Sequence, residues 1–225
     1  MATRAVCRAL VSFLVILTVS AEGSWPSNSG DFDPPPKADT LNIKNPKPGS
    51  QPLSFTPVEL KAYEYTLGIP LPHGWSGRIW GRTDCSTDAG GNFTCATGDC
   101  GSGNLEYQSG EPSPAATVAE FALGKNGGGA DAYGVSLADG YNLPLLVTPY
   151  YTNQTGGGRC APATCAVDDL DGACPPDQQV KVSGRVVGCK AGSSVSLQKA
   201  CPEAKGSGSF SCAVVDNTYT VTFCP

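Results

Sequence analysis

Histidine is almost absent from this sequence of 225 residues: the single one, His73, lies in a Pro-His-Gly turn. Catalysis by a serine triad needs a histidine base, and no serine–histidine pattern is present to supply it. The cysteines show no CxxC pair followed by a second CxxC or by HxxxH, which is the spacing of structural zinc sites. The sequence therefore predicts neither serine-triad chemistry nor a metal site.

Basic charge and phosphate-binding loops are also scarce. Lys and Arg number 15 against 20 Asp and Glu, and the formal net charge is -5, which disfavours nucleic acid as a partner. The glycine runs at 127–129 and 156–158 do not lead from a strand into a helix, as a phosphate cradle requires. We therefore expect no cofactor.

Long apolar runs are missing. The longest, Ala9–Val19, is too short for a bilayer, and no later stretch approaches the ~20 apolar residues of a transmembrane helix. Arg4 and Arg8 precede this run and the small residues Ser20 and Ala21 follow it, which is typical of a secretory leader. Residues 1–21 are therefore predicted to be a signal peptide, whose removal changes the net charge to -7, and the mature protein is expected to be exported.

Cysteine is abundant, with 11 residues, of which Cys7 lies in the leader. An even number in an exported chain indicates disulfides, although spacing alone does not assign the partners. Cys85 and Cys95 bracket the turn signal Ala89-Gly90-Gly91-Asn92, which predicts a stapled β-hairpin. The ten mature cysteines are Cys85, Cys95, Cys100, Cys160, Cys165, Cys174, Cys189, Cys201, Cys212 and Cys224.

The mature chain divides into two parts. Residues 22–52 are rich in proline, serine and asparagine, which predicts an extended, largely disordered arm. The apolar pattern at Thr40–Ile43 is too short to predict an element. Residues 53–225 are long enough for one domain with a sizeable core.

Apolar residues in this domain alternate with other residues, as in half-buried strands. Helical periodicity is confined to Val195–Ala204, with Ser193 or Ser194 as the N-cap. Regular strands with few helices predict an all-β fold, a disulfide-rich antiparallel β-sandwich. The expected strands are 53–60, 63–69, 77–82, 117–123, 133–137, 143–148, 179–187, 207–213 and 218–223, besides the hairpin.

Five sequence motifs appear in the order that is typical of one family. They are GRIWGRTDC (77–85), CATGDCG (95–101), VAEF (118–121), VSLADGYNLP (135–144) and YTVTFCP (219–225). On these motifs the chain, over residues 56–225, resembles the thaumatin-like proteins, also called pathogenesis-related class 5 proteins. The short stretch between Cys189 and Cys201 is similar to the small members of the family.

The resemblance implies a flattened β-sandwich with smaller disulfide-rich loop domains. It also implies four disulfides: Cys85–Cys95, Cys160–Cys212, Cys165–Cys201 and Cys174–Cys189. Cys100 normally closes a small loop, but its partner position is Tyr107 here. Cys224 normally pairs with a cysteine in the first strand, which this sequence lacks, so Cys100 and Cys224 either pair with each other or stay free. The proline-rich arm takes the place of that strand, which predicts an open sheet edge or reflects a mispredicted gene start.

The resemblance further implies an acidic cleft of one arginine and four acids that binds β-1,3-glucan. Arg78, Glu120 and Asp139 match its positions directly, and Glu203 matches with a longer carboxylate. The fifth position is Gly134, for which Asp131 is a possible stand-in.

Aromatic residues offer a further contact to sugars. Tyr141 and Tyr133 are candidates for stacking on sugar rings, against the commoner alternative that both are core residues. Trp80, which lies in an alternating pattern, is assigned to the core.

Three functions are compatible with these residues. The first is a secreted antifungal defence protein, expected to be a monomer in the apoplast or cell wall, that binds fungal β-1,3-glucan. The second is a weak endo-β-1,3-glucanase with Glu120 as acid and Asp139 as base, since glycoside hydrolysis needs two carboxyl groups. The third is a protein inhibitor of microbial xylanases. The sequons at Asn92 and Asn153 predict N-glycosylation.

Overall fold

The computed structural model describes most of the domain. Outside the described residues lie nearly all of the predicted leader and the proline-rich arm, together with Cys7, Cys100 and Asn153. The described residues are 74–99, 101, 103–104, 115–124, 129–150, 159–190, 194–206, 208–213 and 218–225, with the backbone of 13–15, 40–44, 58–60 and 66–70.

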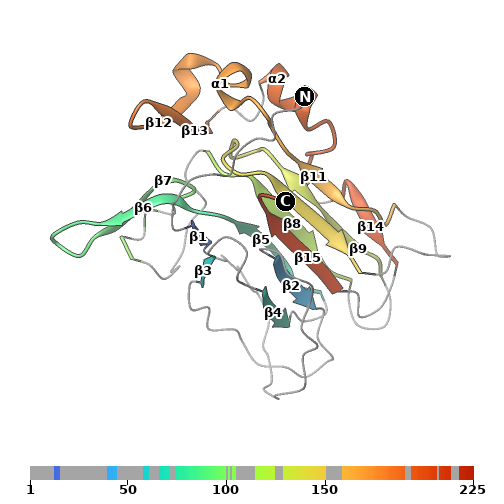
Figure 1. Ribbon diagram of the computed structural model, residues 1–225. Helices are drawn as coiled ribbons and strands as arrows, with labels where there is room; N and C mark the ends of the chain where they lie inside the picture. The colour runs from blue at the N-terminus through green and yellow to red at the C-terminus, as the bar shows by residue number, and fades with distance from the viewer. Residues whose placement is uncertain are drawn as a thin grey trace.

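Two sheets form the predicted sandwich (Figure 1), and their facing side chains make one core. The five-stranded sheet has the order β11 (Ala163–Cys165), β10 (Leu145–Pro149), β15 (Thr218–Phe223), β2 (Thr40–Lys44), β4 (Thr66–Pro70). The four-stranded sheet has the order β14 (Phe210–Cys212), β9 (Asp131–Ser136), β8 (Val118–Ala122), β5 (Ser76–Trp80). Neighbours in both sheets are antiparallel except β2 and β4, which run parallel.

Strand β2 corrects two expectations from the sequence. It lies inside the segment predicted as a disordered arm, yet it pairs with β15 from Thr40↔Thr222 to Lys44↔Thr218. Its other side pairs with β4, so the edge of β15 that was expected to be open is covered. A five-residue segment carries too little pattern to predict, and its backbone partners in β15 come from the other end of the chain.

Three smaller two-stranded sheets flank the sandwich. The predicted hairpin is present as β6 (Thr83–Thr87) and β7 (Phe93–Thr97), with Cys85 opposite Cys95. The others are β1 (Phe13–Val15) with β3 (Val58–Leu60), and β12 (Gln179–Val182) with β13 (Arg185–Cys189).

The prediction of one strand over 179–187 is wrong, because the chain turns back at Ser183 and Gly184. Both residues have positive φ, 50° and 81°, as a two-residue hairpin turn requires. The turn has two residues, an even number, so the alternation of apolar residues continues in phase from β12 into β13. In the sequence the two strands therefore resemble one.

Short helices lie together with the β12–β13 hairpin, and we call this part of the molecule the disulfide-rich lobe (Figure 1). They are α1 (Leu170–Ala173), the 3₁₀ turn η1 (Pro176–Gln178) and α2 (Val195–Ala200). Ser194 caps α2 as predicted, since its Oγ accepts from the Leu197 amide at 3.2 Å. The helix ends four residues earlier than expected, at the residue before Cys201.

The described residues contain four disulfides, and they are the four pairs that the resemblance implies. Cys85–Cys95 crosses the β6–β7 hairpin, and Cys160–Cys212 ties the 159–160 segment to β14. Cys165–Cys201 joins β11 to the end of α2, and Cys174–Cys189 joins the end of α1 to β13. Each stabilises the fold by about 2–4 kcal/mol, mainly by restricting the unfolded chain.

An aromatic row forms the centre of the core. Phe121, Tyr133 and Phe210 are cross-strand neighbours on the inner face of the four-stranded sheet. Tyr219 from the opposite sheet packs against this row, with its ring centroid 5.4 Å from that of Phe121 and 4.9 Å from that of Tyr133. Burial raises the pKa of Tyr133 to about 12, so its hydroxyl stays protonated and donates to the Ala161 carbonyl at 2.7 Å.

A buried carboxylate joins the two sheets. Asp131 is 1% exposed, and its Oδ2 accepts from the Tyr219 hydroxyl at 2.8 Å. Its Oδ1 accepts from the Gly124 amide at 2.7 Å. Because a buried carboxylate is costly without donors, these hydrogen bonds set how β9 lies against β15.

Replacing Tyr219 by Phe tests this link. The substitution Tyr219→Phe keeps the ring but removes the donor to Asp131, so we expect the free energy of unfolding to fall by about 1–3 kcal/mol. Urea denaturation measures it, with Tyr150→Phe as the control, because Tyr150 is 74% exposed. Equal effects of the two substitutions would contradict a bridging role.

Candidate functional site

The outer face of the four-stranded sheet carries two of the predicted site residues side by side. Arg78 on β5 lies directly opposite Glu120 on β8, and Glu120 lies opposite Gly134 on β9. Their chain neighbours Ile79 and Phe121 are buried in the core. Since successive residues of a strand face opposite ways, Arg78 and Glu120 point away from the core.

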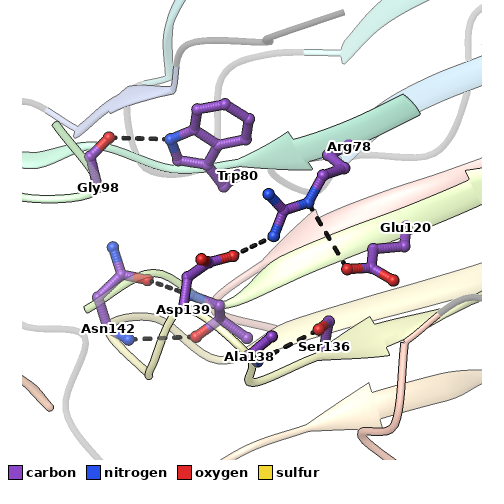
Figure 2. Close-up of polar contacts among 9 residues, drawn as sticks. Arg78, Trp80, Gly98, Glu120, Ser136, Ala138, Asp139 and Asn142 are labelled. Carbon is purple, nitrogen blue, oxygen red and sulfur yellow. Dashed lines mark hydrogen bonds and ion pairs between the residues drawn. The ribbon is translucent and has the colours of Figure 1, made fainter. Parts of the chain in front are cut away.

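Asp139, from the loop after β9, completes the group. Arg78 Nη2 contacts Asp139 Oδ2, and Arg78 Nε lies 3.6 Å from Glu120 Oε1 (Figure 2). The side chains of Arg78, Glu120 and Asp139 are 25%, 21% and 23% exposed, so solvent and ligand can reach all three. We call these three residues the Arg78 cluster.

Hydrogen bonds of the loop backbone hold Asp139 in place. Ser136 Oγ accepts from the Ala138 amide at 3.3 Å, and Gly140 donates its amide to the Leu137 carbonyl at 2.9 Å. The Asp139 carbonyl accepts from the amides of Ala115 and Ala116 at 2.7 and 3.0 Å. The carboxylate is therefore presented by a loop that is tied at both sides.

The disulfide-rich lobe also holds this loop. Tyr141 and Cys189 exchange both backbone hydrogen bonds, at 2.9 and 2.7 Å. Gly140 has φ +97°, and a Cβ there would lie 2.1 Å from the Cys189 carbonyl oxygen. Only glycine permits this approach, which joins the lobe closed by Cys174–Cys189 to the loop of Asp139.

Asn142 is the positioning residue that sequence reasoning missed. Its Nδ2 donates to the Gly81 carbonyl and to Thr97 Oγ1, both at 2.9 Å. Its Oδ1 accepts from the amides of Thr117 at 3.0 Å and Leu143 at 2.8 Å. The sequence showed Asn142 only as a member of the motif VSLADGYNLP. The motif does not reveal which distant groups the Asn142 side chain binds.

Three predicted site residues do not join the Arg78 cluster. Asp131 is not a stand-in for the acid at Gly134, because the odd-numbered positions of β9 face the core and its carboxylate is buried there. Tyr141 is 1% exposed and accepts from the Val167 amide at 3.0 Å, so it has no face for a sugar ring. Glu203 pairs instead with Arg159.

Tyr133, the other candidate for stacking on sugar rings, is instead a core residue. Trp80 is buried as expected, in a small cluster with Ala116 and Val118. Tyr133 is 0% and Trp80 2% exposed, and Trp80 Nε1 donates to the Gly98 carbonyl at 2.9 Å. Neither ring is therefore accessible to a sugar.

The described residues hold no group of three or more His, Cys, Asp or Glu arranged as metal ligands. Their helices are all too short to span a membrane. Asn92 of the first sequon is exposed in the turn between β6 and β7, while the second sequon lies outside the described part of the chain.

Comparisons with known proteins agree with this architecture. The sequence matches the Thaumatin family over residues 41–225, beginning inside β2. It is 37% identical over 205 residues to Thaumatin-like protein 1b of Malus domestica, an alignment that covers 77% of this chain and 93% of that protein. The chain therefore belongs to the thaumatin family.

Two further matches have names that refer to carbohydrate chemistry. A protein of Prunus avium named Glucan endo-1,3-beta-glucosidase is 39% identical over 206 residues, covering 77% of this chain and 80% of that protein. The solved structure of the thaumatin-like xylanase inhibitor TLXI is matched with TM-score 0.43 and 24% identity, covering 82% of this chain and 99% of that one.

Removing the Asn142 side chain tests its positioning role. The substitution Asn142→Ala leaves two buried acceptors and two buried amides without their partner, so we expect the free energy of unfolding to fall by roughly 3 kcal/mol. Chemical denaturation measures it, with Ser86→Ala on the exposed part of β6 as the control. A loss below about 0.5 kcal/mol, the range of surface substitutions, would contradict the role.

Proposed function

We propose that this chain is an exported defence protein, with residues 1–21 as its leader, that binds the β-1,3-glucan of fungal cell walls through the Arg78 cluster. The observation that carries the proposal is the convergence of Arg78, Glu120 and Asp139 on one partly exposed surface. Membership of the thaumatin family supports the same function.

The chemistry of the cluster suits a neutral, hydroxyl-rich ligand. A carboxylate has about four lone-pair sites, so oxygens that pair with Arg78 keep capacity to accept from sugar hydroxyls. Hydrogen bonds to charged groups are stronger than neutral ones. The tied loop of Asp139 reduces the ordering cost of binding, because the carboxylate is already in place.

Hydrolysis of β-1,3-glucan is the second candidate, favoured by the name of the Prunus avium relative. A glycosidase needs one protonated and one ionised carboxyl group. Glu120 and Asp139 both contact the guanidinium of Arg78 (Figure 2), so neither carboxyl group is held free to act on a glycosidic bond. We therefore place binding before catalysis, while inhibition of xylanases stays a prediction from the sequence.

Retention on insoluble β-1,3-glucan tests the binding function. The double variant Glu120→Gln, Asp139→Asn keeps the shape of both side chains but removes their charges, so we expect its apparent affinity to fall at least about tenfold. The matched control is Asp168→Asn, Asp177→Asn, which removes two exposed charges from the disulfide-rich lobe. Equal retention of both double variants would contradict binding through the Arg78 cluster.

Release of reducing sugar from soluble β-1,3-glucan distinguishes binding from catalysis. Because both carboxyl groups are engaged by Arg78, we expect the wild-type protein to release no more sugar than a reaction without protein. Release that is lost in Glu120→Gln would instead establish the second candidate.

A further inference from the structure

The segment after Cys201 lies along β9 next to the Arg78 cluster. Lys205 is opposite Ser136 in an antiparallel bridge, and the Gly206 amide donates to the Val135 carbonyl at 2.9 Å. Directly opposed residues of an antiparallel pair carry their side chains on the same face. Ser136 shares the outer face with Gly134, so Lys205 also projects from the face that carries Glu120.

The glycine at 134 brings this segment close to Glu120. A Cβ on Gly134 would lie 2.0 Å from the Gly206 carbonyl oxygen, so any side chain there would push the segment away. A Cβ on Gly206 would lie 2.5 Å from Glu120 Oε2, which shows that the Glu120 carboxylate reaches over Gly134 to the backbone beside Lys205. Lys205 itself is exposed.

We propose that Lys205 is a second cation of the sugar-binding surface, so that the site carries balanced charge and prefers an uncharged polysaccharide to a cationic one. The inference rests on the proposed function. Arg78 and Lys205 balance Glu120 and Asp139, while the third acid that the resemblance assigns to the cleft, Glu203, is paired with Arg159. The ammonium group of Lys205 has three N–H donors on a flexible stem, which suit the ring and hydroxyl oxygens of a glucan.

The variant Lys205→Glu tests the proposal on two matrices, insoluble β-1,3-glucan and partly deacetylated chitosan. The net negative charge of the chain attracts every variant to chitosan, so the comparison is with Lys199→Glu, an equal charge change at an exposed position of α2. We expect Lys205→Glu to bind glucan about fivefold more weakly than Lys199→Glu, through loss of one donor. On chitosan we expect it to bind about tenfold more tightly at low salt, an excess that 0.5 M salt removes.

Each result decides between the claims. If wild type is retained on glucan but the two lysine variants behave alike on both matrices, the role of Lys205 is overturned and the proposed function stands. If wild type is not retained on glucan, the proposed function fails and this inference with it. Because Lys205 and Lys199 are both exposed, thermal unfolding of the two variants should coincide, and a lower midpoint for Lys205→Glu would attribute its effect to folding and overturn the proposal.

Discussion

The arrangement of the candidate site depends on the hydrogen-bonding capacity of one buried amide, Asn142. Its donors and acceptor hold the β5–β6 connection at Gly81, β7 at Thr97, and the start of β8 at Thr117. Three segments far apart in sequence therefore converge beside the loop of Asp139. No aspartate or leucine of similar size could replace it, because both donors and acceptors are used at once.

One disulfide, Cys174–Cys189, also helps to position the loop of Asp139. Cys174–Cys189 closes the lobe of α1 and β13, and Cys189 then pairs with Tyr141 through its backbone. A disulfide normally acts by limiting the unfolded chain, but here Cys189 also hydrogen-bonds to the loop that carries Asp139. The stability of the lobe and the position of Asp139 are therefore coupled.

Gly134 and Gly206 change what the site can do. Without side chains, these glycines allow the segment of Lys205 to lie against β9, and the carboxylate of Glu120 occupies the space beside it. The surface therefore has fewer acids and one more cation than the family resemblance implied. This arrangement is the basis for the proposed preference for a neutral sugar polymer.

Sequence patterns were sufficient for the elements with local signals. Alternating apolar residues predicted most of the sandwich strands, the turn at Ala89–Asn92 predicted the β6–β7 hairpin, and Ser194 predicted the start of α2. Motif order pointed to Arg78, Glu120 and Asp139 as one candidate site, and the structure brings these three side chains into contact.

Contacts between distant segments were decided only by the tertiary structure. Strand β2 has too few residues to show a pattern, and its stability comes from β15 at the other end of the chain. Asp131 looked like a substitute for the acid that is missing at Gly134. Because successive residues of a strand face opposite ways, however, its side chain points into the core. Alternation along one strand is a property of the sequence, whereas which side chains from other strands face it depends on how the sheets pack.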